Sequence, residues 1–161
     1  MEYGYQMIEN DLRAAIIREL ELSIQEINPD FMLIPRRKWL SIDNEHRIVD
    51  LLFYHRNMQC MMPIYLTFGE LQKDDIEWMK ANLQTLFKYK IRLGDNKPIG
   101  FILCVQDNKE HVELIALEPS KGFISKNLIE FPLKQIFKAR LHEAVLIVRN
   151  QLMAGEVSGE K

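Results

Sequence analysis

RIVDLLFYHRNMQCMMPIYLT, residues 47–67, holds two nearly continuous apolar runs separated by a short polar break. Runs such as Arg47–His55 and Met58–Leu66 are typical of strands that are covered on both faces of a sheet. Because only Arg56 and Asn57 separate the runs, no crossover connection fits between them, and they are expected to pair as antiparallel neighbours. The sequence therefore predicts a hairpin in the middle of a sheet.

The predicted hairpin places one carboxylate on a defined face. With a tight turn between the runs, Asp50 lies opposite Pro63. Side chains alternate along a strand, so Tyr65 and Thr67 share the face of Asp50. A divalent cation that hydrolyses a phosphodiester needs hard oxygen ligands on such a face, and only Asp50 supplies a carboxylate there.

The rest of the chain alternates between helical and extended patterns. Apolar residues at helical spacing predict three longer helices, over residues 6–27, 71–89 and 132–153, the last starting at Pro132. Extended patterns predict strands over residues 31–42, 98–106 and 122–131. Pro35 indicates that the first of these is an edge strand or carries a bulge. Residues 107–117 are interpreted as a short helix capped by Asp107.

This order of elements places helices on both sides of a mixed, partly antiparallel sheet, which is an α/β/α layer arrangement. Residues 1–153 are predicted to form one domain, and the polar residues 154–161 a frayed tail.

Composition narrows the function classes. The formal net charge of −2 gives no global attraction for a polyanion, so any contact with nucleic acid requires a local basic patch. The first residues lack the pattern of a signal peptide, and no apolar run is long enough to cross a membrane, so we expect a cytoplasmic protein. Cys60 and Cys104 lie in apolar runs, which predicts reduced, buried thiols.

Several short motifs occur together at a specific spacing. They are Asp50-Leu51-Leu52-Phe53-Tyr54-His55, Tyr65-Leu66-Thr67, Gly69-Glu70-Leu71 and Ile99-Gly100-Phe101-Ile102-Leu103-Cys104. In these motifs the chain resembles the C-terminal nuclease-like domain of YhcG-type bacterial proteins, a branch of the PD-(D/E)XK endonuclease superfamily. The resemblance implies a restriction-endonuclease-like α/β/α core.

The resemblance also implies which residues stand at the catalytic positions. The family's metal-binding aspartate maps onto Asp50, its glutamate onto Tyr65 and its lysine onto Thr67. A phenol and a hydroxyl are poor ligands for magnesium, and neither carries the charge of a lysine. The resemblance therefore implies a degenerate site in which Asp50 is vestigial and the sole candidate metal ligand.

Displaced side chains offer an alternative. Glu70 and Lys73 could replace the lost glutamate and lysine, and Glu26 falls where the family often has a glutamate on the first helix. The competing interpretation is that all three are ordinary exposed charges at helix surfaces. Mg²⁺ or Mn²⁺ is expected as a cofactor only if the displaced residues catalyse.

Candidate contacts to nucleic acid come from two places. Arg36 and Lys38 lie beside Trp39, so they could hold phosphates while the ring stacks on a base, although basic residues on an edge strand also prevent unwanted strand pairing. His55 and Arg56 at the predicted turn are further candidates for phosphate contact.

Three functions remain open from the sequence. The leading hypothesis is a catalytically degenerate nuclease-like domain that binds DNA, RNA or a protein without cleavage. The second is an active metal-dependent endonuclease that uses Glu70 and Lys73. The third is a structural interaction module, with a homodimer formed through the apolar face of the last helix, residues 136–148.

Overall fold

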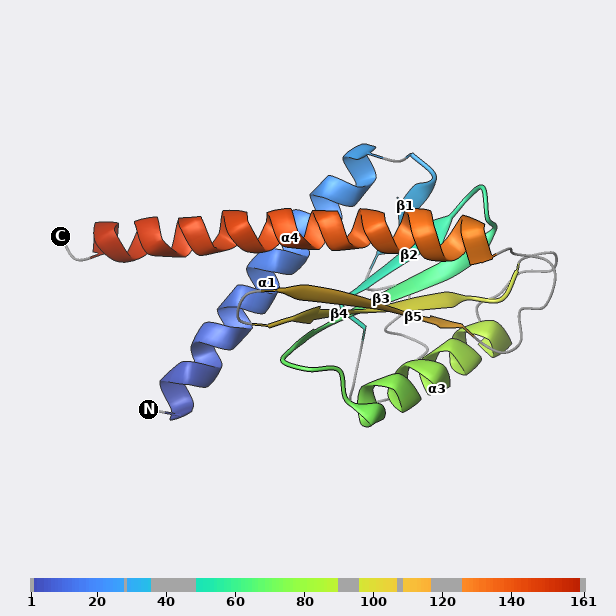
Figure 1. The fold of residues 1–161 in the computed structure, drawn as a ribbon, viewed down its shortest axis with the longest axis horizontal. Coiled ribbons are helices and arrows are strands. Elements are labelled where there is room, and N and C mark those ends of the chain that lie inside the picture. Colours follow the sequence, from blue (N-terminus) through green and yellow to red (C-terminus); the bar gives the residue numbers. More distant parts are fainter. Residues whose placement is uncertain are drawn as a thin grey trace.

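A five-stranded mixed sheet lies between helices (Figure 1). The computed structural model describes residues 2–27, 29–35, 49–89, 96–106, 109–116 and 126–159. The strands are β1 (Phe31–Leu33), β2 (Leu51–His55), β3 (Cys60–Phe68), β4 (Ile99–Val105) and β5 (Glu110–Ala116). The helices are α1 (Glu2–Ile27), α3 (Lys73–Tyr89) and α4 (Lys126–Gly159).

The strands lie in the order β1-β2-β3-β4-β5. Neighbours pair antiparallel except β3 and β4, which are parallel and are joined through α3. A parallel pair needs such a crossover connection. The predicted α/β/α arrangement with a mixed sheet is confirmed, as are the central β2–β3 hairpin and the edge position of the first strand.

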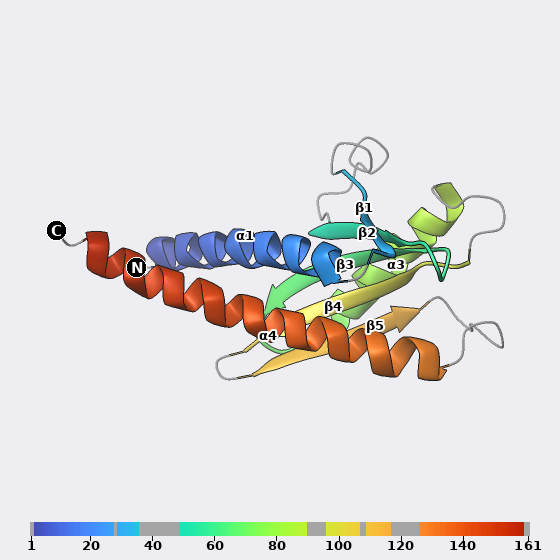
Figure 2. The same cartoon turned by 90° about the horizontal axis from the view of Figure 1, so that it is seen from above.

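Both faces of the sheet are covered. Helices α1 and α4 lie over one face and α3 over the other (Figures 1 and 2). The first face buries a large cluster that includes Phe53, Phe101 and Phe137, all with 0% exposure. On the second face, Met79 and Leu83 of α3 pack on β4. Coverage on both sides explains why β2, β3 and β4 have nearly continuous apolar sequences.

The register of the hairpin differs from the prediction. His55 pairs with Cys60 and Leu51 with Ile64, so residues 56–59 form the turn and the two-residue turn is wrong. Gln59 adopts a positive φ of 51°, which closes this longer turn. Continuing the register by one residue puts Asp50 beside Tyr65 instead of Pro63. The register differs from the predicted one by two residues. Because this number is even, the side chains predicted to share a face of the sheet still share it.

Residues 110–116 form strand β5, so the predicted short helix over residues 107–117 is wrong there. Val112 packs against the α1 and α4 face, whereas Ile115 packs against α3. Burial on both faces removed the simple alternation that would have indicated a strand. Asp107, the predicted cap, lies outside the described residues.

Helix α4 begins at Lys126, upstream of Pro132, and the strand predicted over residues 122–131 is wrong in the part that is described. Proline is favoured at the first position of a helix, but it can also lie in the interior. The helix then loses one backbone hydrogen bond, which costs stability. The helix continues to Gly159, beyond the boundary predicted at residue 153.

The apolar face of α4 is used within the chain. Phe137, Leu141 and Val145 are buried against the sheet and α1, whereas Leu146 and Ile147 are 47% and 41% exposed. None of the helices in the described part of the chain is both long enough and apolar enough to cross a membrane.

Both cysteines are buried free thiols, as predicted. Burial, with Asp75 and Glu113 nearby, raises the pKa of Cys104 to about 11. The thiol therefore stays protonated near neutral pH and behaves as a small apolar side chain.

Candidate functional site

Strand β3 extends past the start of β2, and Asp50 lies at this point. Strand β2 pairs with residues 60–64 of β3, so Tyr65–Phe68 continue beyond it. Asp50 immediately precedes β2, and its Oδ2 accepts a hydrogen bond from the backbone N–H of Leu66 at 2.6 Å. The carboxylate thus satisfies a backbone donor that β2 does not reach.

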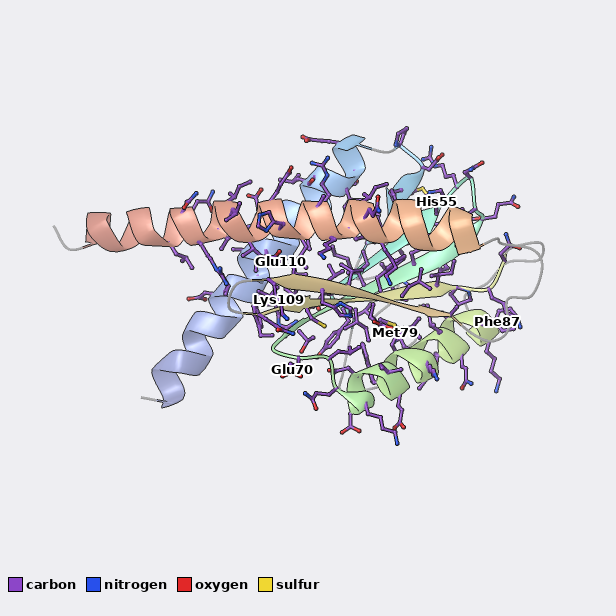
Figure 3. The ribbon with its side chains drawn as sticks, in the orientation of Figure 1. His55, Glu70, Met79, Phe87, Lys109 and Glu110 are labelled. Atoms are coloured by element: carbon purple, nitrogen blue, oxygen red, sulfur yellow. The ribbon has the colours of Figure 1, made fainter. Side chains whose placement is uncertain are left out.

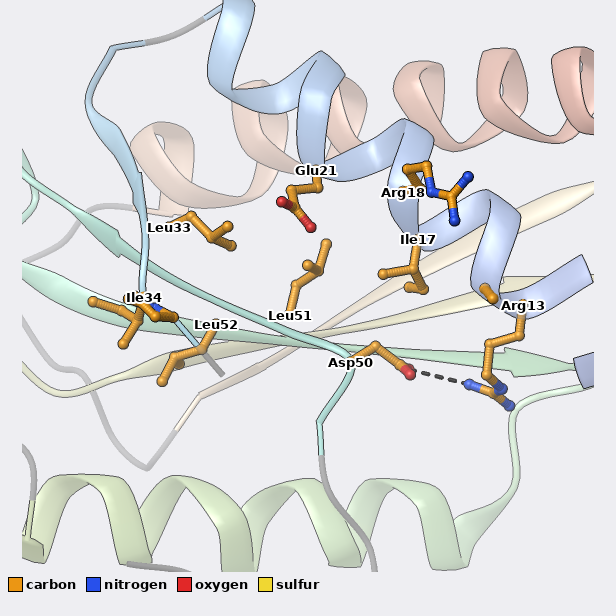
Figure 4. A pocket seen from close by; sticks show the side chains of 11 residues that line it. Arg13, Ile17, Arg18, Glu21, Leu33, Ile34, Asp50, Leu51 and Leu52 are labelled. Carbon is orange, nitrogen blue, oxygen red and sulfur yellow. Dashed lines mark hydrogen bonds and ion pairs between the residues drawn. The ribbon is translucent and has the colours of Figure 1, made fainter. Parts of the chain in front are cut away.

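Arg13 of α1 meets Asp50 at this end of the sheet (Figure 4). Its Nη1 donates to Oδ2 of Asp50 at 3.1 Å and also to the carbonyl oxygen of Leu66. The guanidinium carbon lies 5.7 Å from the ring centroid of Tyr65 and 5.5 Å from that of Phe68. A side-chain cation of the protein therefore neutralises Asp50, and the same cation lies near two aromatic rings.

Sequence reasoning misses Arg13, because its partner Asp50 lies 37 residues away. One signal was present. Arg13, Ile17 and Glu21 recur every fourth residue and so lie on one face of α1, beside the buried stripe that contains Ile16. A charged residue at the border of a buried stripe can reach a polar group at the edge of the sheet.

Tyr65 and Thr67 are the residues that the resemblance predicts at the positions of the family's glutamate and lysine. The ring of Tyr65 packs on that of Trp78 from α3, with centroids 4.7 Å apart. Both side chains are neutral and bind hard cations weakly. With Arg13 hydrogen-bonded to Asp50, these residues do not fit a divalent cation.

The displaced candidates are exposed side chains. Glu70 is exposed near the start of α3 (Figure 3), and Nζ of Lys73 lies 3.9 Å from Oε2 of Glu77, with both side chains exposed. Glu26 is exposed and follows Arg13 by 13 residues on α1, a rise of about 20 Å. In the part of the chain that is described, no three His, Cys, Asp or Glu side chains form a group that could hold a metal. Catalysis by these residues stays a prediction.

A cavity of about 820 Å³ lies beside Asp50, between α1 and the edge formed by β1 and β2 (Figure 4). Apolar side chains of these elements line much of it. Its charged lining residues are Arg13, Arg18, Glu21 and Asp50. Two cations and two carboxylates balance, so this lining provides no net attraction for a polyanion.

His55 faces the core rather than the solvent, with 5% exposure (Figure 3). Its ring meets that of Phe31 edge-on at 4.8 Å, and its Nδ1 accepts a hydrogen bond from the backbone N–H of Met58 at 3.1 Å. Burial lowers the pKa of His55, and Asp30 partly offsets this effect. The imidazole is therefore held neutral and stabilises the turn after β2.

Arg56 is exposed in the same turn, where its Nη2 lies 3.6 Å from the sulfur of Met32. The turn and Asp50 lie at opposite ends of β2, about 20 Å apart. The other predicted contacts to nucleic acid, Arg36, Lys38 and Trp39, lie outside the described residues.

Comparison with known proteins agrees with the fold and with the resemblance in the motifs. The family model described as the YhcG PDDEXK nuclease domain matches residues 1–141. The chain is 29% identical over 134 residues to the "Putative nuclease YhcG" of Escherichia coli (strain K12), which covers 82% of this chain and 36% of that protein. This chain thus corresponds to about a third of its relative's length. No solved structure gives a significant match. The chain therefore belongs to the YhcG PDDEXK nuclease domain family.

Proposed function

We propose that this chain is a catalytically degenerate member of its family, which binds nucleic acid without cleaving it. The observation that carries the proposal is the state of Asp50. Its carboxylate is hydrogen-bonded to Arg13 and to the backbone of Leu66. By the resemblance, Tyr65 and Thr67 take the places of the family's glutamate and lysine. Phosphodiester cleavage by a metal depends on several charged oxygen ligands, and one engaged carboxylate does not supply them.

A site without catalytic residues can still belong to a protein that binds nucleic acid. The chain forms a five-stranded mixed sheet, and Arg36, Lys38 and Arg56 supply positive charge despite a net charge of −2. Phosphate contacts of this kind require no metal and no catalytic base.

The first test is a cleavage assay combined with gel shifts. Single- and double-stranded DNA and RNA are incubated with the purified protein in Mg²⁺ or Mn²⁺. We expect retarded complexes without metal-dependent products. Cleavage that is lost on Glu70→Gln, but kept on Glu143→Gln as a control at an exposed glutamate of α4, would establish the displaced-residue enzyme instead.

The third function, an interaction module, is favoured by one observation. Leu146 and Ile147 of α4 are exposed although large and apolar. If the protein binds no nucleic acid and light scattering shows a dimer that Ile147→Asp dissociates, self-association through α4 replaces nucleic-acid binding as the proposed function.

A further inference from the structure

One nitrogen atom at the candidate site donates hydrogen bonds to two oxygen atoms. Nη1 of Arg13 donates both to Oδ2 of Asp50, at 3.1 Å, and to the carbonyl oxygen of Leu66. The Asp50 side chain is only 11% exposed, so its negative charge needs a nearby cation. The guanidinium supplies that cation from α1.

Both oxygen atoms belong to chemical types that a hard divalent cation accepts. Carboxylate and backbone carbonyl oxygens are the usual protein ligands of Mg²⁺ and Ca²⁺. Here they converge on a nitrogen that carries its own positive charge. A guanidinium and a metal ion cannot occupy the same place between Asp50 and Leu66, because both would fill the space at these oxygens and their like charges repel.

The ring of Tyr65 fits the guanidinium and not a metal. Arg13 lies 5.7 Å from the ring centroid of Tyr65, within the range of cation–π attraction. Phe68 contacts it at 5.5 Å in the same way. The faces of both rings carry negative potential, which attracts the guanidinium.

We propose that Arg13 is an internal cation that takes the place of a divalent metal at Asp50 and excludes metal from this site. The inference rests on the proposed function, because it explains how the site is held together without catalysis. Arg13 also connects α1 to the end of the β2–β3 pair. It is a positioning residue, whose removal is expected to expose the two oxygens to a metal.

The test is metal binding, with Mn²⁺ itself as the probe, measured by electron paramagnetic resonance and by calorimetry. Three variants are compared, and all carry Tyr65→Glu, which adds a second carboxylate. The first has this substitution alone, and the second also has Arg13→Ala. The third has Arg18→Ala instead, as the matched control from the same helix. We expect Arg13→Ala/Tyr65→Glu to bind Mn²⁺ at least about tenfold more tightly than the other two variants. Equal affinity with and without Arg13 would overturn the inference.

A second measurement does not depend on metal or on Tyr65. Arg13→Ala should lower the thermal midpoint by several degrees, because Asp50 loses its cation. Adding Asp50→Asn keeps an oxygen that can accept from Leu66 and removes the charge, so it should recover more than half of this loss. Arg18→Ala should leave the midpoint near that of the unaltered protein. Strictly additive losses for the Arg13 and Asp50 substitutions would contradict the role of Arg13.

The two proposals can fail separately. Metal-dependent cleavage by the unaltered protein overturns the proposed function. Mn²⁺ binding by Tyr65→Glu that is insensitive to Arg13, with no cleavage by the unaltered protein, overturns only the role of Arg13.

Discussion

Asp50 shows how one side chain can keep its place in a fold while its partners change. The carboxylate accepts from the backbone of Leu66 at the point where β3 continues past β2. A buried backbone N–H without a partner costs about 1–3 kcal/mol, so Asp50 stabilises the sheet whatever else it binds. Its identity alone therefore does not indicate catalysis.

His55 provides a prediction on pH. The folded state lowers the pKa of His55 below the usual 6.5, mainly through burial. Above pH 6.5 the residue is neutral in both states and its contribution to stability is complete. As the pH falls, the unfolded chain takes up a proton first, so this contribution is lost down to the folded pKa, with a slope of at most about 1.4 kcal/mol per pH unit.

Urea unfolding between pH 7.5 and 5.5 tests this expectation, with the range chosen around the ordinary histidine pKa of about 6.5. The free energy of unfolding should fall less steeply in His55→Gln than in the unaltered protein. The same slope in both proteins would show that His55 is not held neutral.

The candidate site was predictable in part. Asp50, Tyr65 and Thr67 could be found from the sequence because they lie within one local hairpin whose alternation fixes their faces. Arg13 could not, because its contact depends on how α1 crosses the sheet. The burial of His55 was also missed, since the predicted turn was too short and placed it at the tip.

Among the elements, the central strands were the easiest to predict, because they form a hairpin or a long apolar run. All seven residues of β4 are buried, and their sequence indicated a central strand. Strand β5 lies at the edge and mixes charged with apolar residues. Its buried residues Val112 and Ile115 are three positions apart, which is also the spacing of one face of a helix. Only pairing with β4 distinguishes the two interpretations.

Gly100 of β4 lies directly under Met79 and Leu83 of α3. A Cβ atom at this position would lie 2.6 Å from Sδ and 2.8 Å from Cγ of Met79, which points toward the sheet (Figure 3). Gly100→Ala should therefore destabilise the protein by about 1–3 kcal/mol through overpacking. Chemical denaturation measures the change.

Met79→Ala is the matched background for this prediction, because it removes both clashing atoms. In that background Gly100→Ala should cost clearly less than in the unaltered protein. An equal cost in both would mean that the contact between α3 and β4 is not what requires glycine.

For the whole molecule, charge and size limit what the chain can bind. The net charge of −2 provides no general attraction for nucleic acid, and the charged residues that line the cavity beside Asp50 balance. The chain corresponds to 36% of its Escherichia coli relative, so the activity and partners of that longer protein do not transfer to it directly. Any affinity for nucleic acid in this chain has to arise from a few local cations.

Binding to nucleic acid should therefore depend strongly on salt and on Arg36, Lys38 and Arg56. Each cation that neutralises a phosphate releases counterions, so the logarithm of the affinity should fall linearly with that of the salt concentration, with a slope of about −0.7 to −0.9 per contact. Replacing all three residues by alanine should weaken gel shifts and flatten this slope by about two to three. Arg140→Ala on α4, whose guanidinium already pairs with Glu143, serves as the control and should change neither quantity. If the triple variant binds with the original affinity and the original slope, these residues do not form the nucleic-acid contact, and binding through them is excluded.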